Sequence, residues 1–221
     1  MMSAMPPDAD DPAAEERLRA PPGLLERLRA DPARAPETIA LAAAEQHGPA
    51  ARAWVATQAG RYGHDPAGLA RRAKRQHATL ARVGGAVTGL GGLVGIVPDM
   101  VGLAWIKSRL VFYIAAAYGF DPEDPMRPAE LLVLHDVYPD PPAARRALDG
   151  LDRPLAVHYA DRRLGSADSQ LVRRLALMAG KEATQRLAGR VIPGVASVLN
   201  ATTNERATRA LADRAIRFYG G

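Results

Sequence analysis

The sequence predicts an all-α protein in which several helices pack into one compact domain. Alanine, the residue with the highest helix propensity, makes up about a fifth of the chain, whereas aromatic residues make up only 5%. Apolar residues recur at helical spacing, and no long stretch alternates apolar and polar residues as a half-buried strand would. An all-β fold or a doubly wound α/β fold is therefore not expected.

The length and composition are those of a folded chain without thiol chemistry. The 221 residues suggest one domain, or one domain with an appendage, because domains average about 150 residues. Hydrophobic residues make up 48% and charged residues 24%, as in globular proteins. The absence of cysteine excludes disulfides, thiolate metal sites and cysteine nucleophiles.

The N-terminal segment differs in composition from the rest of the chain. Residues 1–35 are rich in Pro, Ala and Asp, which predicts a weakly ordered tail with a short helical turn from Leu24 to Leu28. The helical domain is expected to span residues 36–221. Its first helix begins near Pro36, and Gly48 is expected to interrupt it before a second short helix.

The next helix has a clear start and an unusual second half. Asp65 as N-cap and Pro66 at the first helical position predict that start. Seven of the twenty glycines fall between positions 84 and 102. Glycine costs about 1 kcal/mol relative to alanine in a helix, so close approach of another helix is the expected compensation. The glycines expected to pack in this way are Gly85, Gly89, Gly91, Gly92 and Gly95.

The packing partner is predicted to be the helix that follows. Pro98 is expected to end the glycine-rich helix, and Asp99 to N-cap a helix from Met100 to Tyr118. Gly119 is expected to stop that helix as a C′ residue. The break would fold the two helices into an antiparallel, glycine-rich hairpin.

Three further helices complete the predicted domain. A turn rich in Asp and Pro leads to the first, Ser166 caps the second, and a break at Pro193-Gly194 precedes the last, from Val195 to Phe218. The apolar positions expected to face the core are Leu131, Leu132, Leu134 and Val137, then Leu171, Leu175, Met178 and Leu187, then Val195, Val198, Leu199, Leu211, Ala215 and Phe218.

The glycine run allows two functional interpretations besides tight packing. It is reminiscent of a dinucleotide-binding loop, but no strand precedes it. Membrane insertion is the second interpretation. The uncharged stretch from residue 83 to 98 would span only about 24 Å as a helix, and Lys107 and Arg109 fall within the expected partner helix. A tightly packed helix pair is favoured, and shallow insertion stays open.

The central and C-terminal blocks also resemble a known family. The first block runs from Gly84-Gly85 through Gly89 to Asp99, then Arg109, then from Ile114 to Asp121. The second runs from Ile192 to Ser197, then Asn200 and Asn204, then from Ala212 to Tyr219. Together they are similar to EcsC-family proteins over residues 65–219. Ala196 stands where the family usually has glycine.

The resemblance implies a helical bacterial protein and supplies no catalytic residue. The family is named after a companion of an ABC transporter, which implies a role near the membrane, linked to a transporter. No enzymatic chemistry and no cofactor follow from it.

A basic stretch precedes the glycine run, and residues 61–82 carry six basic groups against one acidic group. Arg71, Arg72, Lys74 and Arg75 are expected to contact anionic lipid headgroups, with a solvated helix face as the alternative. Nucleic acid is not expected as a partner, because no aromatic residues are interleaved with the basic ones.

Local motifs for catalysis or metal binding are absent from the sequence. The five histidines form no HxxxH or HExxH pair, and no nucleophile elbow or phosphate-binding loop occurs. Asp99 is expected mainly as a helix cap. In the alternative, it pairs with Arg109 or Lys107 beside a buried ligand pocket that Asn200 and Asn204, four residues apart on one helix face, would line.

These observations favour a non-catalytic accessory or scaffold at the cytoplasmic membrane face, with an anionic membrane surface or a membrane protein as partner. No apolar segment of signal-peptide length occurs before Pro36, which favours a cytoplasmic location. The alternative is a soluble helical ligand-binding protein or enzyme with a polar pocket around Asp99.

Overall fold

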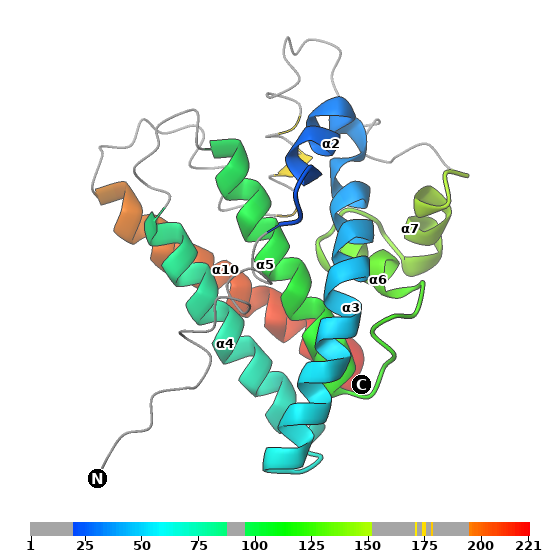
Figure 1. The fold of residues 1–221 in the computed structure, drawn as a ribbon, viewed down its shortest axis with the longest axis vertical. Coiled ribbons are helices and arrows are strands. Elements are labelled where there is room, and N and C mark those ends of the chain that lie inside the picture. The colour runs from blue at the N-terminus through cyan, green and yellow to red at the C-terminus, as the bar shows by residue number, and fades with distance from the viewer. Residues whose placement is uncertain (1–19, 88–95, 152–170, 172–173, 176–177, 179–194) are drawn as a thin grey trace.

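The computed structural model describes residues 20–87, 96–151, 171, 174–175, 178 and 195–221, and every regular element in this part of the chain is a helix (Figure 1). The predicted all-α class is therefore confirmed. The helices are α2 (Leu24–Ala30), the 3₁₀ turn η1 (Pro32–Arg34), α3 (Ala35–Tyr62), α4 (Pro66–Val87), α5 (Ile96–Ala117), α6 (Arg127–Leu134), α7 (Pro141–Leu148) and α10 (Val195–Gly220).

Helix α5 is the centre of the core. It packs against α3, α4, α6 and α10, and every side chain from Leu110 to Ala117 is buried. The helix ends as predicted at Gly119, which has a φ of +84°. The Phe120 N–H donates to the carbonyl of Ala115 and the Gly119 N–H to that of Ala116, which is the hydrogen-bond pattern of a Schellman cap.

Helix α4 packs against both α5 and α10. The N-terminal end of α10 lies beside the C-terminal end of α4, so these two helices are antiparallel (Figure 1). Lys74 on α4 donates to Asp213 on α10 at 2.5 Å. Of the glycines expected to pack, Gly85 lies in α4, and Gly89, Gly91, Gly92 and Gly95 fall outside the described residues. The glycine-rich hairpin therefore remains a prediction.

The hydrophobic core includes residues from the N-terminal segment, 1–35, that the sequence predicted to be a weakly ordered tail. Residues 24–30 form α2, which agrees with the predicted helical turn, and the side chains of Leu24 and Leu28 are fully buried. Helix α2 packs on α3, so its leucines join the same core as α5.

The predicted break at Gly48 is wrong, because α3 is continuous over 28 residues and includes both Gly48 and Pro49. Gly48 has a different role. A Cβ atom at this position would lie 3.0 Å from the carbonyl oxygen of Pro122 and 3.1 Å from Cγ of Glu123. The glycine therefore allows the turn after α5 to approach the helix backbone closely.

Two other local predictions are also wrong. Helix α5 begins at Ile96, so Pro98 and Asp99 lie within its first turn and Asp99 is not the N-cap residue. Proline is compatible with this position because the first turn has no intrahelical N–H bonds to lose. At the C-terminus Phe218 is 43% exposed, and its neighbour Tyr219 occupies the buried position. By contrast, Leu171, Leu175, Met178, Leu211 and Ala215 are buried as predicted.

Two glycines of α3 provide a direct test of this packing. We expect Gly48→Ala to lower the free energy of unfolding by about 1 kcal/mol, because the clash with Pro122 outweighs the gain in helix propensity. The Pro122 carbonyl cannot easily recede, since Arg52 holds both Asp121 and Glu123 on either side of it. Gly60→Ala is the matched control. A Cβ at Gly60 meets nothing within 4 Å, so this change should stabilise by up to about 1 kcal/mol. Urea denaturation measures the free energy of unfolding of both variants. Equal effects of the two substitutions would contradict the close approach of Pro122 to Gly48.

Candidate functional site

A buried polar cluster lies where α3, α4 and α5 meet. Trp105, Arg109 and Tyr113 are four residues apart and therefore share one face of α5. His47 of α3 lies on Trp105, with ring centroids 4.4 Å apart, and His77 of α4 lies edge-on to Tyr113 at 5.1 Å. These five residues are called the Arg109 cluster below.

The two histidines of the Arg109 cluster are neutral. Burial lowers the pKa of His47 to about 3, and the neighbouring Arg109 and His77 act in the same direction by disfavouring a second positive charge. Burial likewise lowers the pKa of His77 to about 3, with Arg109 as the second cause. The Nδ1 atom of His77 lies 2.8 Å from the carbonyl oxygen of Ala73. In a neutral ring Nδ1 must carry the hydrogen of this bond, which leaves Nε2 as an acceptor.

Arg109 is half-buried and lacks an acidic partner in the described part of the chain. Its Nη2 donates to the hydroxyl of Tyr113 at 2.8 Å, and its guanidinium carbon lies 4.7 Å from the centre of the Tyr113 ring. Several buried polar atoms around it have no hydrogen-bond partner. They are His47 Nε2, His77 Nε2, Trp105 Nε1 and Arg109 Nε.

The structure brings only part of the predicted ligand site together. Arg109 does belong to a buried polar group, but its partners come from α3 and α4. Asp99 lies ten residues before it on the same helix, about 15 Å along the axis, which is too far for a direct ion pair. Asn204 is half-buried on α10, and the side chains of Asp99 and Asn200 fall outside the described set. The sequence interpretation missed His47 and His77, for which no local motif was available.

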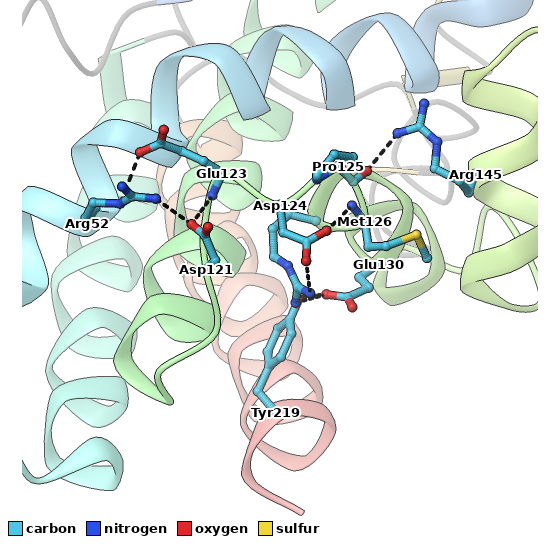
Figure 2. Close-up of polar contacts among 10 residues, drawn as sticks. Arg52, Asp121, Glu123, Asp124, Pro125, Met126, Glu130, Arg145 and Tyr219 are labelled. Carbon is cyan, nitrogen blue, oxygen red and sulfur yellow. Dashed lines mark hydrogen bonds and ion pairs between the residues drawn. The ribbon is translucent and has the colours of Figure 1, made fainter.

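A second polar group joins the turn after α5 to the C-terminal helix. Arg127 forms an ion pair with Glu130, and the Tyr219 hydroxyl donates to the same carboxylate oxygen of Glu130 at 2.7 Å (Figure 2). The guanidinium of Arg127 also lies near the rings of Phe120 and Tyr219. Burial raises the pKa of Glu130 and raises that of Tyr219 well above its ordinary value.

The acidic residues of this turn are satisfied by internal partners (Figure 2). Arg52 of α3 binds Asp121 at 2.6 Å and Glu123 at 3.2 Å. Asp124 accepts a hydrogen bond from the backbone N–H of Met126 at 2.7 Å. Arg145 of α7 donates to the carbonyl of Pro125 at 2.7 Å. The turn is therefore a structural junction, because its charged groups bind each other and leave no convergent donor set for a ligand.

A third polar group lies between α5, α6 and α10. Burial lowers the pKa of His135 to about 3, and the charges of Lys107 and Arg214 act in the same direction. Lys107 is buried, and Arg214 binds Asp136 at 2.6 Å. This histidine is surrounded by different charges from those in the Arg109 cluster.

The basic residues of α4 divide into an exposed stripe and a packed position. Arg71, Arg75 and Arg82 are exposed, and their spacing places them within about 40° of one another around the helix. These three residues are called the arginine stripe below. Lys74, by contrast, is only 23% exposed and binds Asp213, so it ties α4 to α10. Arg72 is half-buried and also has an interaction partner.

Two features of the described residues bear on metal and membrane chemistry. No group of three His, Asp or Glu side chains with metal-binding geometry occurs among the described residues. One segment of the described residues, Met100–Ala117, is long and apolar enough to cross a membrane by length and composition. Within the fold, 78% of this segment is buried, and a core helix of this kind passes the same test.

The fold and these polar groups define an all-helical protein built around one buried helix, with an arginine stripe on its surface. The model of the EcsC protein family matches residues 65–220, which is more than half of the chain. The chain therefore belongs to the EcsC protein family. No curated protein and no solved structure matches it.

Proposed function

We propose that the protein is a non-catalytic accessory or scaffold that binds the anionic cytoplasmic face of the membrane through the arginine stripe. The observation that carries the proposal is the exposure of Arg71, Arg75 and Arg82 on one face of α4. The family resemblance noted in the sequence adds a link to a membrane transporter as the expected setting, with a membrane protein as a further partner.

The geometry of the stripe suits a charged surface. Its three guanidinium groups extend over about 17 Å along the helix axis, a length comparable with several lipid headgroups. Each basic residue close to an anionic membrane contributes about 1 kcal/mol. Three therefore raise membrane partitioning by roughly a hundredfold. Arg71 lies 3.6 Å from the exposed carboxylate of Asp65, a weak surface contact that a lipid phosphate can replace.

Co-sedimentation with liposomes tests this proposal. The wild-type chain is expected to bind vesicles containing phosphatidylglycerol and not vesicles of phosphatidylcholine alone. Replacing the stripe by Arg71→Gln, Arg75→Gln and Arg82→Gln should lower binding by about a hundredfold. Raising the salt from 0.1 M to 0.5 M should weaken wild-type binding, because the Debye length falls from about 10 Å to about 4 Å.

A charge-matched variant separates the stripe from net charge. Arg27, Arg29 and Arg146 are exposed on α2 and α7, and their replacement by Gln removes the same three charges. This control is expected to bind anionic vesicles as the wild type does. Equal losses in the two variants, or equal binding of neutral and anionic vesicles, would refute a specific role for the stripe.

A further inference from the structure

The Arg109 cluster contains more unpaired polar atoms than a closed core tolerates. Four of its buried nitrogens lack a partner, namely those of His47, His77, Trp105 and Arg109. Leaving a buried polar group unpaired costs about 1–3 kcal/mol, so the four together represent a large destabilisation in one place. Buried polar groups in native proteins almost always have a protein, water or ligand partner.

The unpaired atoms are of two complementary kinds. Arg109 Nε and Trp105 Nε1 are donors only. His77 Nε2 is an acceptor, because the Nδ1 hydrogen of that ring binds the carbonyl of Ala73. The ring of His47 also bonds to the backbone, at Trp105, and its Nε2 is the unpaired nitrogen. A molecule that fits must therefore accept from the arginine and tryptophan and supply hydrogens to the imidazoles.

The charge of the cluster favours an anion. Arg109 carries a positive charge that no carboxylate balances in the described residues, and its side chain is partly open to solvent. Arg109 acts on both histidines, and His77 also acts on His47. Two acidic groups on helices that pack against α5 have other partners, since Asp213 of α10 binds Lys74 and Glu130 of α6 binds Arg127.

We propose that Arg109, Trp105, His47 and His77 bind a small phosphate-class oxyanion together with a proton. The guanidinium and the indole N–H donate to the anion, and the proton lies between an anion oxygen and an imidazole Nε2. The hydrogen phosphate dianion brings only one hydrogen to the lone pairs of two neutral rings, so uptake of one further proton must accompany its binding. The anion is either free phosphate or the phosphate monoester of a lipid headgroup, which share this chemistry.

Isothermal titration of the full-length chain with inorganic phosphate tests the proposal. Titrations at pH 6 and pH 8, each in two buffers of different ionisation enthalpy, measure the protons taken up. We expect one saturable site and an uptake approaching one proton at pH 8, where free phosphate is mostly the dianion. The affinity should fall about tenfold per pH unit above pH 8. Sulfate, which carries no proton, should bind at least tenfold more weakly at pH 8.

Variants identify the residues, and the wild-type chain provides a readout that is independent of folding defects. Arg109→Gln and His77→Phe should each weaken phosphate binding at least tenfold, whereas Arg52→Gln, on the far side of α3 at Asp121, should leave it unchanged. In the wild type, the NMR signals of the His47 and His77 imidazole nitrogens should shift on titration, and those of exposed His64 should not.

Several results would overturn the inference. They are the absence of saturable binding up to about 10 mM phosphate, unchanged affinity in Arg109→Gln, or binding without proton uptake at pH 8. A comparison with dihexanoyl phosphatidic acid identifies the source of the anion. Tighter binding of that lipid indicates a headgroup, tighter binding of inorganic phosphate indicates the free ion, and either order supports the site.

Discussion

A chain that begins at residue 64, one residue before the family match starts, is expected not to fold. It should show no cooperative thermal transition and no near-ultraviolet circular dichroism, although the family model covers nearly all that remains. The reason is that α3 lies outside the family match and forms one wall of the core around α5. Ile39, Ala40, Ala43 and Ala51 of α3 are all buried in that wall.

The size of this effect follows from what α3 covers. Trp105 and Phe112 of α5 are fully buried, and His47 of α3 contacts both rings. An aromatic side chain buries about 150–250 Å², so exposing the two would cost at most about 8–12 kcal/mol at 25 cal/mol per Å². The whole stability of a domain is only about 5–15 kcal/mol, so partial exposure is enough to unfold the shortened chain.

Co-expression of the two fragments controls for this truncation. Residues 20–63 and 64–221 meet in an exposed segment around Gly63 and His64, so a break there interrupts no packed element. The two fragments are expected to co-purify and to recover a cooperative transition. A cooperative transition of the 64–221 fragment alone would show instead that the family segment is self-sufficient.

What the sequence predicted correctly depends on local signals. Asp65-Pro66 and Gly119 mark helix ends through the backbone chemistry of a few neighbouring residues, and both ends lie where expected. Gly48 carries the same kind of signal but lies inside a helix, because packing against α5 outweighs the local cost of Gly48 and Pro49. Local propensity alone cannot reveal such a tertiary effect.

The candidate site illustrates the same limit. Arg109 could be singled out because a cation within an apolar helix is conspicuous in the sequence. Its neighbours His47 and His77 come from separate helices, 62 and 32 residues earlier in the numbering of the chain, and nothing near them distinguishes them from surface histidines. Lys74 is the opposite case, since the ion pair with Asp213 could not be foreseen from a basic stretch on α4.

Acid is expected to destabilise the protein strongly between pH 7 and pH 5. Burial lowers the pKa of His47, His77 and His135 to about 3, whereas unfolded histidine has a pKa of about 6.5. Above pH 7 the three rings are neutral in both the folded and the unfolded state, so they do not change the free energy of unfolding. As the pH falls through 6.5, the unfolded chain takes up three protons that the folded chain refuses, so stability is lost progressively towards pH 3.

The magnitude can be worked out for each histidine. From pH 7 to pH 5 each ring lowers the free energy of unfolding by about 2 kcal/mol, and the three together by about 6 kcal/mol. Glu37 and Glu130 act in the opposite direction, because burial raises the pKa of both and the folded state then binds protons more readily. Because the folded pKa of each carboxyl lies above its ordinary value, this contribution offsets part of the histidine loss within the same window, and single-histidine variants are needed to separate the two.

Urea denaturation at pH 7 and pH 5 measures the loss. His77→Gln cannot titrate, so its stability should fall by about 2 kcal/mol less than that of the wild type over this interval, whatever its stability at pH 7. His64→Gln is the matched control, since it removes a histidine that is exposed rather than buried. Identical pH dependence of the two variants would show that His77 takes up a proton in the folded protein.

His135 connects this prediction with the proposed anion site. Lys107 and Arg214 act on its ring, and Arg109 is not among the charges that lower its pKa. A phosphate bound with a proton at the Arg109 cluster should therefore reduce the acid destabilisation that His47 and His77 cause, and leave the share of His135 unchanged. In His135→Gln, phosphate should then reduce the remaining pH dependence by at most the share of one ring, about 2 kcal/mol, because one proton is taken up with the anion. In Arg109→Gln, phosphate should leave the pH dependence of stability unchanged. The anion no longer has a cation to bind, and all three histidines still contribute to the acid destabilisation.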